Sequence, residues 1–447
     1  MADLLIPAGT DIVEFKLSFN GDNYFWIVDD FQLYNVYPSL TSPLAIGTYL
    51  HSIGYAYGTD SLRHPYKKDE IIAQFKPTAT AADKDSIRRK FTVCVTQCLC
   101  NTLDKWNLRY AVPNQNPNAT VYSVVIEEIV DGAKSKPKIE SVESNYYQYD
   151  ELLPKAQTYY PDATTKLISI PLTTLNSNLL HTKVAVLDTD IDYNNQTNAA
   201  TIYKSLTEII NNSDENGNCL IDDVIVYNFI YPQNCSQLGN NNPNNNYLHG
   251  SHVTGIIRNS LQQLYTNAPP YICNGVNFLA VKTHDSLGIG TLFSTTCGVY
   301  YTVQIGAKVI NCSWGYYAQD EAYASILRDA VLYANSKNAL VVAAVGNDSI
   351  LIQSPDVHFP SSYTLPNVVA VACINTPHAA LSVFSNYSLV FVDIASPGEN
   401  ISSNRICGST VVKSSTSMSA LVVSAVVAWK YCNAPNSMAA NIHDEIL

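Results

Sequence analysis

Several features that would place this chain in a common class of protein are missing from its sequence. There is no run of 18 or more apolar residues, so we predict no transmembrane helix. Lys and Arg number 26 against 38 Asp and Glu, and the net charge of −12 argues against a nucleic-acid partner or an anionic membrane surface. The first residues do not combine a basic stretch with a long apolar stretch, so no signal peptide is visible.

A compact metal-binding signature is also missing. The eleven cysteines are scattered except for Cys94-x3-Cys98-x-Cys100, and their odd number leaves at least one unpaired. Eight Asn-x-Ser/Thr triplets suit a secreted glycoprotein, but an Asn-rich chain also produces them by chance. The composition therefore leaves the compartment open.

With 447 residues, 47% of them hydrophobic, the chain can bury a large core and form two or three domains. Residues 1–65 carry short alternating apolar runs, which predict a β-rich N-terminal segment without recognisable chemistry. Residues 66–150 predict a small α+β domain, and residues 151–165, with Pro154 and Pro161, a linker. The elements expected in the α+β domain are strands at 69–76, 122–130 and 139–149 and a helix at 81–91.

Residues 166–447 have a different character, because short β-branched runs alternate with helical patterns. This alternation predicts an α/β fold with a doubly wound, mostly parallel sheet. The expected strands are 184–187, 277–281, 308–311, 339–344 and 367–372, and the expected helices 292–305, 320–337 and 437–447. In such sheets, functional residues gather beyond the carboxyl ends of the strands.

Unusual polar residues stand at these places. Asp188 follows the apolar strand KVAVL, His249 opens HGSHVTGI, and Asn347 ends LVVAAVGN. Ser417 lies in a small-residue turn just before an apolar helix, where free backbone N–H groups favour developing negative charge. Each has an ordinary alternative: a turn aspartate, a core or zinc-binding histidine, a turn asparagine, and a helix N-cap.

Taken together, VAVLDTDID, HGSHVTGI, VVAAVGN and STSMSA resemble the Asp, His, oxyanion-hole and Ser motifs of the subtilisin-like serine proteases, the subtilases. The resemblance covers roughly Lys183 to the C-terminus, and FLAVKTHDSLGIGTL, VINCSWG, VVAVACIN and VDIASPGENI agree in place and order. A nucleotide-binding α/β protein is disfavoured, because no glycine-rich loop follows the first strand.

The resemblance implies a serine endopeptidase acting on polypeptide substrates. Ser417 would be the nucleophile, His249 the base and Asp188 the residue that orients it, with Asn347 as oxyanion donor. The chain departs from the family pattern at Asp190, Ser415 and Leu421, where the family has Gly, Gly and Pro. Ser415 stands beside the oxyanion hole, so the alternative reading is a weak or silent subtilase scaffold that acts as a binding protein.

The resemblance also implies how substrate binds. An extended substrate would pair with the edge ending VINCSWG, and the residues implied are Ser313, Trp314 and Gly315, with Ala344 and Gly346 in one wall of the primary pocket. No acidic cluster indicates a specificity, so we expect an apolar or broad preference. An ordinary packed aromatic is an equally good interpretation of Trp314.

The stretches DEIIAQFKP and IESVESNYYQY resemble the start and end of a subtilase propeptide. The chain would then be a zymogen inhibited by its own propeptide, with Asn145–Asp150 in the cleft and self-cleavage between about Tyr149 and Pro161. A permanent accessory domain is the alternative. The family favours secretion or the cell surface, although no leader is visible.

We expect no required cofactor. The segment Asp214–Asp223 resembles an insert in some bacterial subtilases, and its carboxylate and amide oxygens would suit a structural Ca²⁺. The glycine position and the missing terminal Glu do not fit an EF-hand, so an Asx-rich turn is preferred and no metal ligand is assigned. Cys219 and Cys235 flank part of this long polar insertion and could pair in an oxidising compartment.

Overall fold

A computed structural model describes residues 57–59, 65–99, 103–108, 129–150, 182–189, 191, 202–230, 249–267, 275–285, 287–375, 380–404 and 410–447. Contacts divide the chain into Met1–Pro38 and Ser39–Leu447, and every described residue belongs to the second unit. The strands expected in residues 1–65 therefore lie outside the described residues, apart from β1 (Tyr57–Thr59).

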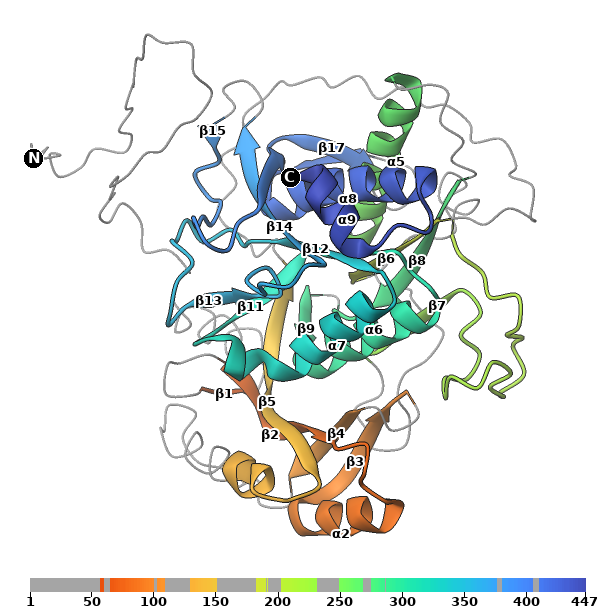
Figure 1. The fold of residues 1–447 in the computed structure, drawn as a ribbon, viewed down its shortest axis with the longest axis vertical. Helices are drawn as coiled ribbons and strands as arrows, with labels where there is room; N and C mark the ends of the chain where they lie inside the picture. The colour runs from red at the N-terminus through yellow and green to blue at the C-terminus, as the bar shows by residue number, and fades with distance from the viewer. Residues whose placement is uncertain are drawn as a thin grey trace, which may run out of the picture. The chain divides into compact units, whose positions relative to one another are not determined.

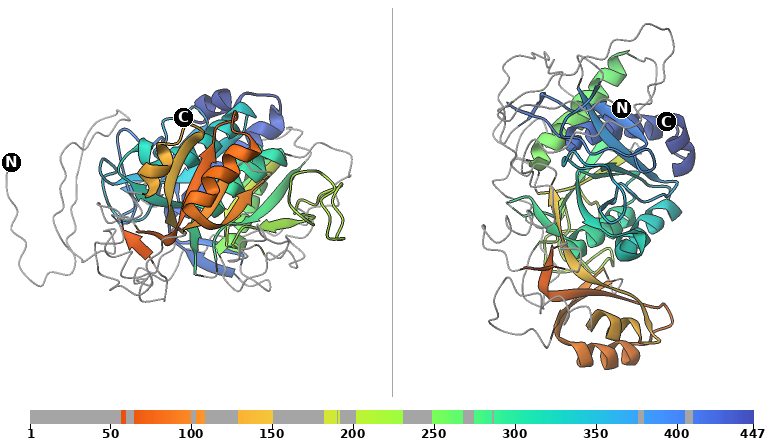
Figure 2. Two further views of the ribbon diagram at one scale, coloured as in Figure 1. Left: turned by 90° about the horizontal axis from the view of Figure 1, so that it is seen from below. Right: turned by 90° about the vertical axis from the view of Figure 1, so that its left-hand side faces the viewer.

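The N-terminal region, residues 65–150, is an antiparallel sheet with one long described helix, α2 (Ala81–Phe91). Its strands are β2 (Pro65–Phe75), β3 (Thr92–Cys98), β4 (Leu103–Leu108) and β5 (Ile139–Asp150), in the order β5-β2-β4-β3. Helix α2 begins where predicted, because Thr80 and Asp83 form a reciprocal capping box. Figure 2 shows α2 lying across one face of these strands.

Two parts of the prediction for this region were incomplete or wrong. Strands β3 and β4 were not predicted, since TVCVTQC and LDKWNL alternate weakly between polar and apolar residues. The strand expected at 122–130 lies mostly outside the described residues, and its last two residues, Ile129 and Val130, begin a helical turn instead. The strands expected at 69–76 and 139–149 are confirmed as β2 and β5.

The parallel-sheet region, residues 182–447, confirms the predicted α/β fold (Figure 1). Its sheet runs in the order β15-β14-β12-β10-β6-β8-β7, with β16 beside β14, and only the β14–β15 pair is antiparallel. The strands are β6 (Thr182–Asp188), β7 (Val226–Asn228), β8 (Val276–Lys282), β10 (Val309–Cys312), β12 (Leu340–Ala344), β14 (Val368–Asn375), β15 (Ala380–Leu381) and β16 (Ile394–Pro397).

Helices cover both faces of this sheet, and Figure 1 shows α6 and α7 on one side of the strands and α8 with α9 on the other. Alternate strand residues therefore enter two cores, Leu187 packing with the α6 layer and Val186 with the α8 layer. The helices are α5 (His249–Asn267), α6 (Leu292–Gln304), α7 (Ser325–Ser336), α8 (Thr416–Asn433) and α9 (Ala439–Ile446). The helix expected from residue 320 begins as the 3₁₀ turn η1 (Glu321–Ala324).

Strand β5 belongs to both regions. Its first part pairs with β2, and its last residues pair with β9 (Ile289–Thr291) on one side and β11 (Trp314–Ala318) on the other, both antiparallel. Strand β11 also pairs with β13 (Val357–Phe359), so one continuous sheet runs from β3 to β13. The remaining hairpin is β17 (Ile401–Asn404) with β18 (Thr410–Lys413).

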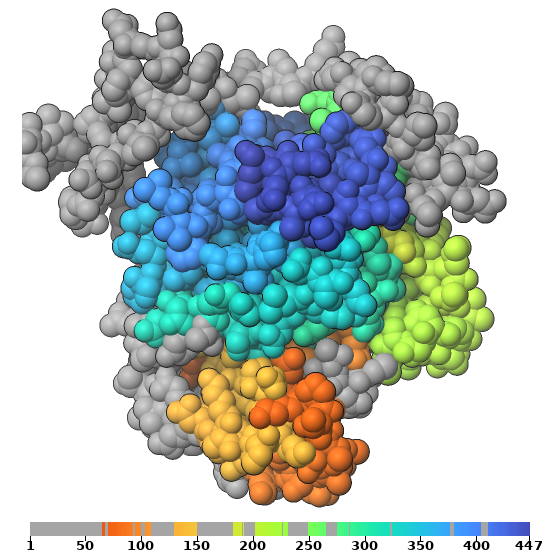
Figure 3. Space-filling model, in the orientation of Figure 1, coloured from red at the N-terminus to blue at the C-terminus, as the bar shows by residue number. Residues whose placement is uncertain are grey.

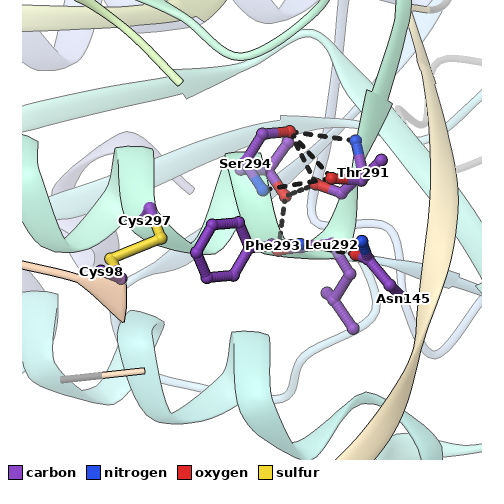
Figure 4. The surroundings of a disulfide bond; sticks show 8 residues. Cys98, Asn145, Thr291, Leu292, Phe293, Ser294 and Cys297 are labelled. Carbon is purple, nitrogen blue, oxygen red and sulfur yellow. Dashed lines mark hydrogen bonds between the residues drawn. A yellow bond between two sulfur atoms is a disulfide. The ribbon is translucent and has the colours of Figure 1, made fainter. Parts of the chain in front are cut away.

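Specific contacts reinforce this shared strand (Figure 4). Asn145 accepts a hydrogen bond from the backbone N–H of Phe293 at 3.0 Å and donates to Glu70 at 2.7 Å, so one buried amide joins the first turn of α6 to β2. A disulfide joins Cys98 of β3 to Cys297 of α6. The N-terminal region is thus covalently tied to the parallel-sheet region by a bond between residues 199 positions apart in the sequence.

At the surface, residues 202–230 form an irregular patch, yellow-green in Figure 3, in which Leu206, Ile209 and Ile210 are exposed. Among the described helices, none is both long and apolar enough to cross a membrane. Among the described cysteines, Cys312 and Cys373 are free thiols, and both are buried. Cys219 is disulfide-bonded, but Cys235, its expected partner, lies outside the described residues.

Glu143 of β5 caps the N-terminus of α7. Its Oε1 accepts hydrogen bonds from the Ser325 hydroxyl and, at 2.9 Å, from the Ile326 N–H. Oε2 is buried and makes no hydrogen bond within the described part of the chain. Burial raises the pKa of Glu143 above its ordinary value of 4.5, although these hydrogen bonds act in the opposite direction.

We expect Glu143→Gln to stabilise the chain at high pH. A raised pKa means that the folded state binds the proton more tightly, so stability falls as the pH rises above about 4.5. Glutamine keeps a carbonyl acceptor without the charge, so the unfolding midpoint at pH 8 should rise by about 2–4 °C, or roughly 1 kcal/mol. At pH 5 the difference should shrink. The measurement is the midpoint of thermal unfolding as a function of pH, made in a Ser417→Ala background, with the exposed Glu140→Gln as control. The same pH dependence of the midpoint in both variants would contradict the prediction.

Candidate active site

Asp188 is the last residue of β6, at the carboxyl edge of the parallel sheet. Its Oδ1 accepts hydrogen bonds from the Thr189 N–H at 2.6 Å and the Thr189 hydroxyl at 3.2 Å. The backbone carbonyl of Asp188 accepts from the N–H groups of Thr283 and His284, so its position is held from the neighbouring strand end. Burial by itself raises the pKa of Asp188, but His249 and the Thr189 N–H lower it overall.

His249 is the first residue of α5 and faces this carboxylate. Its Nδ1 lies 3.0 Å from Asp188 Oδ1 and 2.9 Å from Oδ2, and both side chains are buried. The N–H of Gly250 also reaches the Thr189 hydroxyl at 3.5 Å. A buried carboxylate at this distance favours the imidazole with its proton on Nδ1 and stabilises the ring when it becomes charged.

Ser417 is the second residue of α8, where backbone N–H groups have no partner inside the helix. Its hydroxyl donates to the Ser313 carbonyl at 3.3 Å, which places the side chain beside the strand that ends with VINCS. The helix dipole adds partial positive charge at this end. Ser417 is also fully buried. Its position at the helix N-terminus is therefore suited to developing negative charge.

Asn347 follows β12 and a glycine, Gly346, whose φ of +98° is unfavourable for other residues. Its side chain is bound at both ends to the N-terminus of α8. The Oδ1 accepts from the Thr416 N–H at 2.9 Å, and Nδ2 donates to the Ser415 hydroxyl at 2.9 Å. These two contacts fix the amide orientation, with its N–H groups beside Ser417.

The predicted substrate-binding residues are brought together only in part. Trp314 and Gly315 of β11 lie opposite Asp150 and Tyr149 of β5, and the Ser313 carbonyl accepts from Ser417. Ala344 instead packs into the core beneath α8, so its side chain does not line the cleft. Trp314 is 1% exposed, and its ring lies 5.7 Å from that of His284, in keeping with a packed aromatic.

Three histidines near this site gave no clear signal in the sequence. Burial lowers the pKa of His252 and of His284 to about 3, so both are neutral at ordinary pH. The imidazole of His358, on β13, is buried against Gly315, where any Cβ would overlap with it. A Cβ on Gly346 would lie 3.3 Å from its Nε2. His358 is a lone histidine in VHFP, so only the strand pairing reveals this position.

The Asp214–Asp223 segment has the hydrogen bonds of an Asx-rich turn. Asp214 accepts from the N–H groups of Gly217 and Cys219 at 2.7 Å, and Asp222 accepts from that of Asn211 at 2.8 Å. Burial raises the pKa of Asp223 to about 6. Calcium would have to displace these backbone donors, so the residues do not fit a ready Ca²⁺ site. The described residues contain no group of three or more metal-binding side chains. Asp190, where the chain departs from the family pattern, lies outside the described residues.

The comparisons with known proteins agree with this arrangement. The chain is 27% identical over 376 residues to the thermophilic serine proteinase of Bacillus sp. strain AK1, covering 81% of this chain and 78% of that protein. It is 28% identical over 268 residues to subtilisin-like protease 1 of Plasmodium falciparum, but spans only 37% of its length.

A crystal structure of the epidermin leader peptide processing serine protease of Staphylococcus aureus has the same fold, with a TM-score of 0.55 and 17% identity. The match covers 85% of this chain and 92% of that one. The model of the subtilase family matches residues 181–446, which is more than half of the chain. The protein therefore belongs to the subtilase family and is a subtilisin-like serine endopeptidase.

Proposed function

We propose that the chain hydrolyses peptide bonds through an acyl-enzyme formed on Ser417. The observation that carries this is the Asp188–His249 contact of 2.9–3.0 Å at one strand end, with Ser417 and Asn347 meeting at the N-terminus of α8. His249 would take the Ser417 proton as Oγ bonds to the substrate carbonyl carbon. It would then pass that proton to the leaving amine, and water would release the acyl group by the reverse sequence.

The negative charge of the tetrahedral intermediate falls on the former carbonyl oxygen. The Nδ2 group of Asn347 and the N–H of Ser417 are its proposed donors. Ser417 is fully buried and Asn347 is half-buried, and such hydrogen bonds are strongest away from water. Asp188 would stabilise the charged imidazole without itself taking the proton.

We further propose that the chain is a self-inhibited zymogen, with residues 66–150 as the inhibitor. The support is the pairing of β5: Tyr149 lies opposite both Ile289 of β9 and Gly315 of β11. An extended substrate would need these same strand edges, so the end of β5 competes with it directly. The expected cleavage lies between about Tyr149 and Pro161, and the part of this range after Asp150 is outside the described residues.

We expect Ser417→Ala to abolish both labelling by a fluorophosphonate probe and self-cleavage, because no other group can form the acyl-enzyme. In related subtilisin, loss of the serine costs about 10⁶ in kcat. Asn347→Ala should keep the labelling site but lower kcat by at least about tenfold, against the about 10²–10³ that loss of one oxyanion donor costs in subtilisin. Gel analysis with N-terminal sequencing follows both reactions, with Ser437→Ala as a serine control. Persistent labelling of Ser417→Ala would refute the assignment. A wild-type chain that is labelled only after another protease has removed the propeptide would be a zymogen that does not process itself, and one that stays unlabelled even then would favour a silent binding scaffold.

We expect the cleaved propeptide to remain attached until the protein is reduced. Cleavage between about Tyr149 and Pro161 separates the backbone, but Cys98 and Cys297 lie on opposite sides of the cut. Non-reducing gels should show one full-length species and reducing gels two fragments. In a Cys98→Ser/Cys297→Ser variant, the fragments should separate without reductant. Wild-type fragments that separate without reductant would contradict the prediction.

The primary pocket can be described more closely than the sequence allowed. Gly315 and Gly346 would form its walls, and the imidazole of His358 lies against both. We propose that this ring shortens the pocket, so small residues are preferred before the cleaved bond. A large aromatic residue would have to displace a buried ring held by a 2.9 Å hydrogen bond from Nδ1 to Ser361 Oγ.

We therefore expect His358→Ala to raise kcat/KM for a peptide with Phe before the cleaved bond about tenfold relative to the matched Ala peptide. The reason is the space vacated by the ring, since each methylene in an apolar pocket contributes about 1–3 kcal/mol to discrimination. His443→Ala, on α9, is the control. An unchanged Phe/Ala ratio would place His358 outside the pocket.

A further inference from the structure

Both proposed oxyanion donors already share an acceptor within the chain. The Nδ2 group of Asn347 donates to the hydroxyl oxygen of Ser415 at 2.9 Å, and the backbone N–H of Ser417 donates to the same oxygen at 3.0 Å. Ser415 is 1% exposed. These distances fall within the 2.7–3.1 Å over which such donors bind a developing oxyanion. The Ser415 hydroxyl oxygen therefore lies where the substrate oxygen would have to be.

Helix capping explains only half of this arrangement. A serine before a helix commonly accepts from the N–H of the second or third helical residue, as Ser415 does from Ser417. The cap does not require Asn347, which comes from a different strand and is fixed by its own contact with the Thr416 N–H. The convergence of two donors from separate elements on one hydroxyl is the feature that a cap leaves unexplained.

We propose that the Ser415 hydroxyl fills the oxyanion hole and must rotate out before a substrate carbonyl can enter, so that Ser415 limits turnover. This inference rests on the proposed function, because it takes Asn347 and the Ser417 N–H as the donors. Ser415 is a positioning residue in this account. It acts on the reaction through the two donors that it occupies.

The backbone of Ser415 is held while its side chain can turn. Its N–H donates to the Gly398 carbonyl at 3.0 Å, and its own carbonyl accepts from Met418 at 3.1 Å. Its φ of −174° and ψ of 158° are extended angles open to any residue. Rotation about χ1 between staggered positions would move only the hydroxyl. Replacement by Gly or Ala therefore needs no backbone change and removes the competing oxygen.

The test compares Ser415→Gly and Ser415→Ala with the wild-type chain. After titration of active sites, we expect kcat to rise about tenfold in both variants while KM stays within twofold. A peptide aldehyde, to which Ser417 Oγ adds while His249 takes its proton, should bind about tenfold tighter because its oxyanion enters the hole. Thermal unfolding of each variant measures separately how much stability is lost with the helix cap.

A second test compares the effect of Asn347→Ala on kcat in two backgrounds that differ at residue 415. Asn347→Ala should cost about 10²–10³ in kcat when residue 415 is Gly, and about tenfold less in the wild-type chain, where the donor is already engaged. If both Ser415 variants unfold at lower temperature and kcat falls or stays the same, Ser415 is only a cap and the inference is wrong. If the fluorophosphonate fails to label the wild-type chain and both variants even after their propeptides have been cut and released by reduction, the proposed function fails and the inference with it.

Discussion

The site depends on the backbone N–H groups at the start of α8, which have no hydrogen-bond partner within the helix itself. Thr416 N–H binds Asn347, Ser417 N–H binds Ser415, and the Ser417 hydroxyl binds Ser313. Three segments far apart in the sequence thus meet at one helix end. Because a helix cannot satisfy these donors itself, the surrounding strands must end where their acceptors can reach it. The apolar face of α8, buried under the sheet, holds that end in place.

A second constraint is the open edge of two strands. Unpaired edges of β9 and β11 would expose a row of hydrogen-bonding groups, and the end of β5 satisfies both at once. The contacts of Asn145 with Phe293 and of Glu143 with Ile326 anchor the same strand to the first turns of two helices. The N-terminal region is therefore bound through backbone pairing, helix capping and a disulfide together.

The sequence was sufficient to predict the helices and strands that depend on residues close together in the chain. Helix α2 could be placed because Thr80 and Asp83 mark its start, and β6, β10 and β12 because their runs are apolar on both faces. The proposed site residues were predicted from family motifs and not from periodicity; they are Asp188, His249, Asn347 and Ser417. The remainder depends on contacts across the fold: His358 reaches Gly315 only because β13 pairs with β11, and Ser415 meets Asn347 only because β12 ends beside α8.

The position of the Ala344 side chain also could not be predicted from the sequence. Its place in VVAAVGN suggested a pocket wall, but strand alternation turns its side chain into the core beneath α8. Strands β3 and β4 were missed because their cysteines, threonines and charges alternate poorly. For Ala344 the deciding information is which face of the strand α8 covers, and for β3 and β4 it is the pairing of the two strands with each other and of β4 with β2.

In the proposed zymogen, the Cys98–Cys297 bond changes the equilibrium by which the inhibitory residues 66–150 would leave the cleft. A severed, untethered propeptide would be lost by dilution, whereas one held by a short covalent link stays at an effective concentration of the order of millimolar. Dissociation of β5 from β9 and β11 then becomes an intramolecular opening that does not depend on protein concentration. Cutting the backbone and freeing the cleft are, in such a molecule, two separate events.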